Sequence, residues 1–457
     1  MSTRCRIKIA ESDFRALETA ARAHLPKEAA VFALAGVART ASGVDVLVRR
    51  VLELPVEDYV EQLTYHLEVS TRAINGLVSL CEVNGLGAVL CHAHGDDSDY
   101  SPSDDFGEAR VFDALRKFAP AQAPTASLLF NADGVRGRVW LLGARRPVNV
   151  DEVVVLGRSI RRIGTTAHAS RIDATFDRQV LAFGETGQRL IEDARVAVVG
   201  TGGTGSPTAE QVVRMGARNP LLMDPDVWDP TSVTRVYRTR RGHENDRRKK
   251  VHRVADGLGE IFGSVPRAVP QSVVVESAAR ELLDRDVIFL CTDDHWGRAV
   301  VNEICHQYLI PVINMGMRIA SRAGQITAAV GVIDVLRPDN PCLWCTGSLD
   351  ARRIAAESMP IAYRAGLAEE GYVEGLDEKA PSVITITTTV SGQAATLFLQ
   401  LLTDFMGAGG DVARINYDAL TGTMRRGRAP IANPCVCRQV RAYGDLRPLS
   451  VIDALPD

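Results

Sequence analysis

The sequence has few aromatic residues, no excess of charge of either sign and no long uninterrupted apolar run. Phe, Trp and Tyr make up 5 % of 457 residues, and the formal net charge is -3, which gives no electrostatic reason to expect nucleic acid as a partner. The most apolar segment, Ile384–Leu401, is interrupted by Thr, Ser, Gly and Gln, which favours a buried helix over a membrane span. The first residues also lack the apolar stretch of a secretory signal. We therefore expect a cytoplasmic protein that binds neither nucleic acid nor membrane.

Cysteine is absent from 346 to 434, a stretch bounded by two close pairs, Cys342 with Cys345 and Cys435 with Cys437. Two thiolates on one tight turn form half of a tetrahedral zinc site. We predict that both pairs together hold one structural Zn²⁺. The alternatives are a redox pair and inert cysteines.

Strand and helix patterns fall into two α/β blocks. Residues 1–145 combine short strand-like runs with helical patterns near Ser12–Ala23 and Ser70–Val83, and a connector with scattered charge is expected at 146–173. From 174 to 457, helices alternate with the strand-like runs RVAVVG, NPLLMD, AVPQSVVVE and DVIFLCTD. Such alternation predicts a parallel sheet with crossover helices in the second block.

A glycine-rich loop follows the first strand of the second block. Glycines permit close approach of backbone N–H groups to an anion, and the N-terminus of the following helix adds a favourable dipole. Alone, such a loop fits any dinucleotide-binding protein of Rossmann type. The four loop glycines are Gly200, Gly202, Gly203 and Gly205.

Charged residues follow at the ends of later strands. Asp224 ends the next strand, where a carboxylate commonly meets a ribose hydroxyl. Arg235 and Lys250 come next, and Asp293 ends a further strand just before Arg298. Cations and acids around one glycine loop suit a nucleoside triphosphate with Mg²⁺, because the cations, together with Mg²⁺, neutralise charge that develops at the α-phosphate.

These motifs resemble the E1-like adenylating domain of the ThiF/MoeB group, which is related to ubiquitin-activating enzymes. The motifs are, in order, FDRQVLAFGETGQ, VVGTGGTGS, DPDVWDPTSVTR, KVHRVADGL and CTDDHWGR. The resemblance implies a Rossmann-like fold, ATP and Mg²⁺ as cofactors, and a homodimer. It also implies a set of residue roles: ribose binding by Asp224, phosphate contacts by Arg235 and Lys250, support of Mg-ATP by Asp293, entry of Arg178 into a partner subunit's site, and further nucleotide contacts by Asp226 and Arg298.

The chain departs from the pattern of this group at three points. Thr231-Ser232 replaces the usual Ser-Asn, and Lys249 is an alternative to Lys250 as the phosphate ligand. Many relatives also carry a nucleophilic cysteine in the stretch where this chain has none. Cys291 and Cys305 are expected to be buried, so a thioester on this chain is not expected. The acceptor of the acyl group would then be an external thiol or an E2-like protein.

The segment CHAHGDDSDYSPSDD carries a second set of candidate residues. His92 and His94 end an apolar strand, where residues two apart face the same side and can ligate one ion. Asp104 is the candidate third ligand, which leaves a position for water, as a catalytic Zn²⁺ requires. Glu28 is the candidate base for that water, and Ser101 the candidate oxyanion donor.

These residues resemble the JAMM (JAB/MPN) isopeptidase pattern, which implies a cytidine-deaminase-like α/β fold for residues 1–145. The usual Pro after the second His is Gly95 here, and the loop to Ser101 is one residue shorter than the usual form. Asp105 is an alternative to Asp104. A degenerate domain that binds no metal is the competing interpretation.

The two candidate sites have opposite chemistries on one kind of bond. One activates a C-terminal carboxylate, and the other hydrolyses the amide or isopeptide made from it. The expected substrate is a small ubiquitin-like or sulfur-carrier protein that ends in Gly-Gly. The alternatives are an adenylating enzyme of cofactor or peptide biosynthesis with a degenerate JAB domain, an NAD-dependent oxidoreductase and a non-catalytic scaffold.

Overall fold

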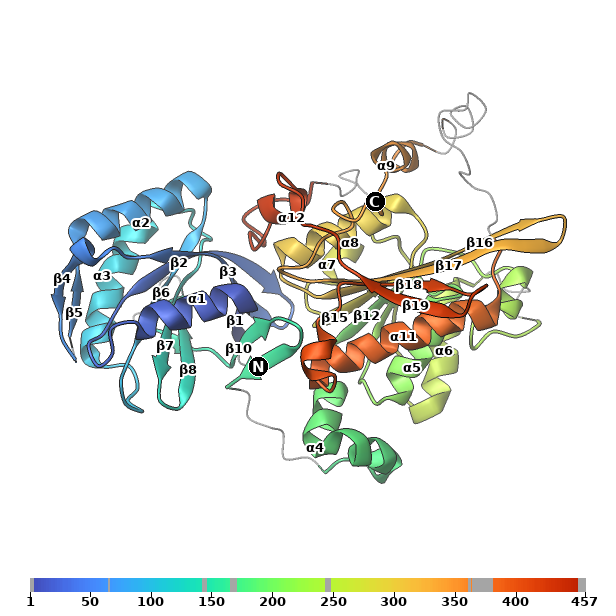
Figure 1. Cartoon of the computed structure of the whole chain (residues 1–457), viewed down its shortest axis with the longest axis horizontal. Coiled ribbons are helices and arrows are strands. Elements are labelled where there is room, and N and C mark those ends of the chain that lie inside the picture. Colours follow the sequence, from blue (N-terminus) through green and yellow to red (C-terminus); the bar gives the residue numbers. More distant parts are fainter. Residues whose placement is uncertain are drawn as a thin grey trace. The chain divides into compact units, whose positions relative to one another are not determined.

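A computed structural model describes residues 4–64, 66–141, 146–164, 171–242, 248–360, 363 and 381–450. The chain forms two compact units (Figure 1). The first unit comprises 1–169, 306–309 and 440–448, and the second comprises 170–305, 310–439 and 449–457. Among the described helices, none is long and apolar enough to cross a membrane.

The first unit is built on a nine-stranded mixed sheet. Its centre consists of buried β-branched and small residues, as expected for strands covered on both faces. In spatial order the strands are β11 (Ile160–Ile163), β10 (Glu152–Leu156), β1 (Arg4–Ala10), β3 (Gly43–Glu53), β2 (Val31–Thr40), β6 (Gly87–Ala93), β7 (Thr125–Asn131), β8 (Gly134–Val139) and β9 (Val148–Asn149).

Helices cover both faces of this sheet. Helix α1 (Glu11–Arg22) packs Phe14 and Leu17 into one core cluster, and helices α2 (Thr71–Asn84) and α3 (Pro102–Phe118) contribute to a second one. A small hairpin of β4 (Tyr59–Gln62) and β5 (Leu67–Val69) follows the 3-10 turn η1 (Val56–Asp58). The sequence predicted α1 and α2 but not α3, because α3 begins with Pro and acidic residues and contains Gly107.

The expected connector requires a correction. Residues 148–163 form β9, β10 and β11 of the first sheet, with β10 pairing in parallel with β1. The side chains of β10 are all buried. Scattered charge in this segment predicted an exposed connector, but one of its acids, Glu152, is buried in an ion pair with Arg6.

The second unit is built on an eight-stranded sheet. The first five strands in spatial order are parallel and the last three antiparallel, so a parallel Rossmann-like part continues into a long antiparallel extension (Figure 1). The strands are β14 (Arg267–Val269), β13 (Leu221–Met223), β12 (Val196–Val199), β15 (Val287–Leu290), β16 (Val312–Arg322), β17 (Gln325–Leu336), β18 (Arg414–Asp418) and β19 (Thr423–Gly427).

Crossover helices connect the parallel strands, and the apolar segment near Ile384 forms the buried helix that the sequence predicts. The segment AVPQSVVVE was expected to be one strand, but only its first residues join β14, because Pro270 has no N–H to continue the ladder. The helices are α4 (Asp177–Asp193), α5 (Gly205–Arg214), α6 (Lys250–Phe262), α7 (Glu276–Arg280), α8 (His295–Gln307), α9 (Ala351–Glu357), α11 (Ile384–Thr403) and α12 (Val436–Gln439), with 3-10 turns η2 (Ala174–Phe176), η3 (Pro230–Thr234) and η5 (Gly407–Gly410).

Candidate functional site

The glycine-rich loop joins β12 to α5 at the carboxyl end of the parallel strands, where ligands bind in open α/β sheets. Gly200 has a φ of 88°, and a side chain at Gly205 would collide with the carbonyl oxygen of Gly200. A Cβ at Gly202 would meet open space. The chain itself therefore requires glycine at the two ends of the loop, and the loop backbone at Gly202 is open to a ligand.

Asp224 and Lys250 lie together beside this loop. The Oδ2 atom of Asp224 accepts hydrogen bonds from the backbone N–H of Thr201 at 2.7 Å and from its hydroxyl at 3.0 Å. The Nζ atom of Lys250 lies 2.6 Å from Oδ2 of Asp226 and 3.6 Å from Oδ1 of Asp224. Burial alone would lower the pKa of Lys250, but the two carboxylates outweigh burial and raise it. The lysine is therefore held as a buried cation.

The two lysines at the start of α6 have different surroundings. Lys250 is buried, whereas Lys249 is half-buried and donates to the backbone carbonyl of Pro225. Arg235 is half-buried, and its guanidinium donates to the carbonyl and the hydroxyl of Thr231 in the preceding 3-10 turn. The charge of Arg235 opposes the protonation of Lys250, so the two cations are neighbours.

Two adjacent carboxylates at the end of β15 have different surroundings. Asp294 accepts hydrogen bonds from the Gly297 N–H and the Thr292 hydroxyl at the start of α8. Asp293 is exposed, and no described residue forms a hydrogen bond with its carboxylate. A carboxylate left open near the glycine-rich loop would suit Mg²⁺, which usually binds in nucleotide sites through one or two carboxylates plus phosphate oxygens. Arg298 is anchored to the carbonyl of Thr292 by Nε at 3.0 Å.

Arg178 does not join this cluster. Its side chain is exposed on α4, and it forms no hydrogen bond or ion pair with another described residue. The sequence did not single out Asp294, although an Asp directly before His-Trp-Gly at a strand end is a typical helix start. It also missed Glu357, which accepts the Trp296 N–H at 2.7 Å at the same helix end.

The four clustered cysteines meet although the two pairs are far apart in sequence. The Sγ atoms of Cys342, Cys345 and Cys435 lie 3.5 to 3.6 Å from one another, and Cys437 lies 4.0 Å from Cys345. A hydrogen bond from the Cys437 thiol lowers the pKa of Cys342 to about 5. Four sulfur ligands around one point, one of them readily ionised, fit a tetrahedral zinc ion.

We expect Cys342→Ser to remove one zinc ion per chain and to destabilise the second unit, because metal binding to such a site is coupled to folding. Metal analysis and thermal unfolding measure both effects. Cys81→Ala is the matched control, since Cys81 is a buried cysteine of α2 outside this cluster. An unchanged zinc content in Cys342→Ser would show that these thiols are not ligands.

In the first unit, the sheet register brings Glu28 to the histidines. Val31 of β2 pairs with Cys91 of β6, so the residues just before β2 lie next to those just after Cys91. The Oε1 atom of Glu28 lies 3.6 Å from Nε2 of His94. Burial raises the pKa of Glu28, which suits a base that takes up a proton near neutral pH.

Asp104 completes the group from the first turn of α3. Its Oδ1 lies 3.4 Å from Nε2 of His92, and its Oδ2 lies 3.9 Å from Nε2 of His94. The Nε2 atom of His92 is buried and forms no hydrogen bond within the part of the chain that the structure describes. Burial alone would raise the pKa of Asp104, but its interactions with His92 and Ser101 hold it well below its usual range. Two imidazoles and a carboxylate around one point, with one imidazole nitrogen unsatisfied, fit a zinc ion.

Ser101 and Asp104 also start α3 as a capping box. The Ser101 hydroxyl lies 2.8 Å from Oδ2 of Asp104, and the Asp104 N–H donates to Ser101 Oγ at 3.2 Å. The structure does not support Asp105 as the alternative ligand. Its carboxylate pairs with Arg138 at 2.6 Å and does not join the group of His92, His94 and Asp104.

Two residues near the histidines were missed by the sequence analysis. The Ser98 hydroxyl lies 2.9 Å from Nδ1 of His94, the kind of contact that fixes the orientation of a ligand ring. The ring of Tyr100 packs edge-on to His92 at 5.9 Å. No pattern marks either residue, because both lie in an irregular loop.

Comparisons with known proteins agree with the geometry of the second unit. The model of the ThiF family matches residues 176–438. Over 179 residues the chain is 26 % identical to the molybdopterin-synthase adenylyltransferase of Escherichia coli (strain K12), a match that covers 38 % of this chain and 68 % of that protein. It is 26 % identical over 195 residues to the sulfur carrier protein ThiS adenylyltransferase of Bacillus subtilis (strain 168), a match that covers 41 % of this chain and 54 % of that protein. It is 43 % identical over 60 residues to the tRNA threonylcarbamoyladenosine dehydratase of the same organism, a match that covers 13 % of this chain and 24 % of that protein.

The family match covers more than half of the chain, and it includes the glycine loop, Asp224, Lys250, Asp293 and all four clustered cysteines. ATP and Mg²⁺ are the cofactors expected for such a protein. The chain belongs to the ThiF family, and its C-terminal part is an E1-like adenylyltransferase with a Rossmann-like fold.

Proposed function

We propose that the second unit adenylates the C-terminal carboxylate of a small ubiquitin-like or sulfur-carrier protein that ends in Gly-Gly. The observation that carries this proposal is the cluster of Asp224, Lys250 and the glycine loop, with Asp293 exposed at the end of β15. Relatives whose names specify a sulfur carrier or molybdopterin synthase support the substrate class. The carboxylate attacks the α-phosphorus of ATP, the bond to pyrophosphate breaks, and an acyl-adenylate forms.

The contacts support a role for each of these residues. Asp224 orients the ribose, and the buried ammonium of Lys250 neutralises charge on the phosphates, assisted by Arg235. Asp226 holds Lys250, and Arg298 is positioned by Thr292 to reach a phosphate. Asp293 is the carboxylate that would hold Mg²⁺, which would neutralise charge on the phosphates when bound.

The acyl group leaves the chain for an external thiol or an E2-like protein. Burial raises the pKa of Cys291 to about 12 and raises that of Cys305 further, so neither is a ready nucleophile. The sequence has no cysteine from 346 to 434.

We further propose that residues 1–145 form a zinc-dependent peptidase or isopeptidase of JAB type that acts on the same protein. His92, His94 and Asp104 would hold the ion, which supplies Lewis-acid activation of a water when bound. Glu28 takes the proton of that water and returns it to the leaving amine. The Ser101 hydroxyl donates to the oxyanion of the tetrahedral intermediate. Such a pair of activities lets one chain attach and release, or mature, a single carrier protein.

A second candidate function is adenylation for cofactor or peptide biosynthesis with a degenerate first unit. The departures at Gly95 and in the short loop before Ser101 favour it. Pyrophosphate exchange driven by a Gly-Gly carrier, together with chelator-sensitive cleavage of a fusion to that carrier, supports the first proposal. Exchange without cleavage by a zinc-loaded protein supports the second.

We expect Lys250→Met to lower ATP–pyrophosphate exchange about a hundredfold or more, because a cation is lost from the phosphate site. Lys249→Met is the matched control and should keep most of the activity, since Lys249 is only half-buried and its ammonium donates to the backbone carbonyl of Pro225. Radiolabelled pyrophosphate exchange measures both variants. Equal losses in the two variants would contradict the assignment of Lys250.

Arg178 gives a test of a homodimer in which each subunit completes the other's site. We expect Arg178→Ala and Asp293→Ala to be defective alone. The two variants are then mixed 1:1, denatured and refolded together, so that their subunits exchange. The mixture should recover about a quarter of the wild-type exchange rate, because about half of the dimers are heterodimers and each heterodimer has one intact site out of two. No recovery in a mixture shown to contain heterodimers would contradict a role for Arg178 across the interface.

A further inference from the structure

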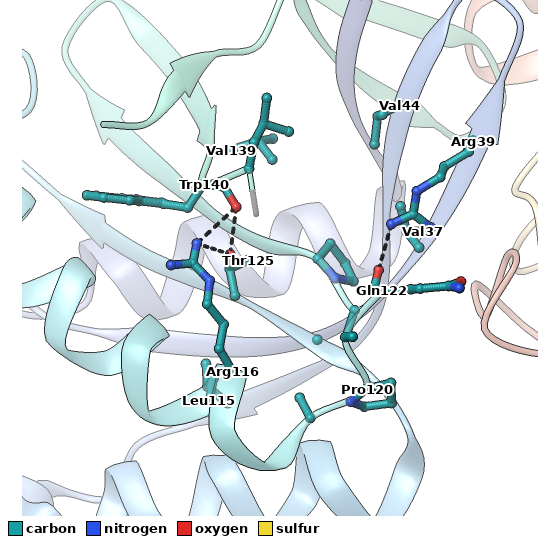
Figure 2. Close-up of a pocket in the computed structure, with 16 residues that line it drawn as sticks. Val37, Arg39, Val44, Leu115, Arg116, Pro120, Gln122, Thr125, Val139 and Trp140 are labelled. Atoms are coloured by element: carbon teal, nitrogen blue, oxygen red, sulfur yellow. Dashed lines mark hydrogen bonds between the residues drawn. The ribbon is translucent and has the colours of Figure 1, made fainter. Parts of the chain in front are cut away.

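The first unit contains a pocket of about 310 Å³ that neither proposed activity uses (Figure 2). It lies where β6 begins, at Gly87, whereas His92 lies near the other end of that strand. The end of α3, the loop 119–124 and strands β2, β3 and β8 form its walls.

Most of the pocket wall is apolar and rigid. Val37, Leu115 and Val139 are buried and present aliphatic side chains. Pro120 and Pro124 restrict the loop between α3 and β7. The volume and the apolar lining correspond to a site for a small molecule rather than for a folded partner.

Two arginines lie on opposite sides of this apolar space (Figure 2). The NH2 nitrogen of Arg116 donates to the carbonyl of Trp140 at 3.2 Å and lies 3.4 Å from the Thr125 hydroxyl. The NH2 nitrogen of Arg39 donates to the carbonyl of Gln122 at 3.0 Å. Each guanidinium is therefore held against the pocket wall through one nitrogen, and Arg116 also donates from Nη1 to Asp113 at 3.5 Å, while N–H donors remain on both groups.

The positive charge of the two arginines is not neutralised by other residues of the pocket lining. No carboxylate is present among the residues that line the pocket. The carboxylate nearest to Arg116 belongs to Asp113, which is 71 % exposed and lies outside the lining, at 3.5 Å. Two preorganised guanidinium groups with an apolar wall between them match an anionic group attached to an apolar body.

We propose that this pocket binds a small organic anion, a carboxylate or phosphate monoester with a short apolar body, whose anionic end binds one of the two guanidinium groups, that of Arg39 or that of Arg116, while its body packs against the aliphatic wall. The lining residues supply no cluster of metal ligands. The proposal is independent of both proposed activities, because the pocket residues belong to neither candidate site.

The first test uses the unmodified full chain and a pair of probes of equal shape. Octanoate and its neutral analogue octanamide are titrated by isothermal calorimetry. We expect octanoate to bind at least tenfold more tightly, since hydrogen bonds to a charged group exceed neutral ones by roughly this factor. Equal affinities, or no binding of octanoate at millimolar concentration, would overturn the proposal.

The second test assigns the arginines. We expect Arg39→Met with Arg116→Met to abolish the tenfold preference for octanoate while octanamide binding persists. Arg110→Met is the control, because Arg110 lies on α3 over the exposed ring of Phe106 and not in the pocket. A preference for octanoate that survives the double substitution would show that the anion binds elsewhere.

Discussion

Asp293→Ala should reduce ATP–pyrophosphate exchange about a thousandfold while leaving the protein folded. The expected loss is large because the variant removes the carboxylate assigned to Mg²⁺, and transition-state charge on the phosphates then lacks its main counter-charge. Folding should survive because the Asp293 side chain is exposed and no described residue bonds to it. The assay is exchange driven by the cognate carrier, with ATP affinity measured separately.

The neighbouring carboxylate makes this prediction sharper. Asp294→Ala removes the residue that caps α8 rather than an open carboxylate. We therefore expect it to lower the free energy of unfolding by about 1 kcal/mol, and to reduce the exchange rate less than Asp293→Ala does. Asp256→Ala, on the exposed face of α6, should change neither. Wild-type exchange by Asp293→Ala would show that this carboxylate is not part of the site.

Glu28→Gln should retain zinc in the first unit and lose cleavage by a factor of about a hundred to ten thousand. Proton transfer by a positioned side chain contributes a rate factor in this range, and glutamine cannot accept the proton. His92→Ala should lose both the zinc and the cleavage, because it removes a ligand. The substrate is a fusion joined to the C-terminus of the carrier protein, assayed with and without a chelator.

Adenylation serves as the control in the same samples. Exchange of pyrophosphate should survive both substitutions, since its residues belong to the second unit. The total zinc of Glu28→Gln should equal that of the wild type, and that of His92→Ala should be one ion lower. Zinc-loaded wild-type protein that cleaves no such fusion would contradict a peptidase and support a degenerate first unit.

The second unit could be predicted from sequence because its pattern is local. A β-branched strand, a glycine loop and a helix occupy consecutive residues, and acids at later strand ends return to the same sheet edge by crossover rules. The choice of Lys250 over Lys249 is supported by burial. Side-chain surroundings were beyond the sequence: nothing local shows that Asp294 caps a helix while Asp293 stays open.

Other features depend on partners distant in the chain. Glu28 meets His94 only because β2 pairs with β6 in the register Val31 to Cys91. The strands at 148–163 were missed because Glu152 is an acid that is buried with Arg6, a pairing across 146 residues. Helix α3 was missed because its first turn is polar, and that turn contributes a ligand as well as a cap.

The double use of Ser101 and Asp104 bears on how such a domain would lose its activity. A Ser at the start of helix α3 and an acid three residues later stabilise the helix as a capping box, whether or not a metal is bound. Folding alone would therefore retain both residues after the chemistry had been abandoned, and a Ser-x-x-Asp pattern is weak evidence of an active centre. His92 has no comparable role in starting a helix, and its buried Nε2 forms no hydrogen bond with a described residue. An inactive descendant should therefore replace this histidine first and keep the serine and aspartate longest.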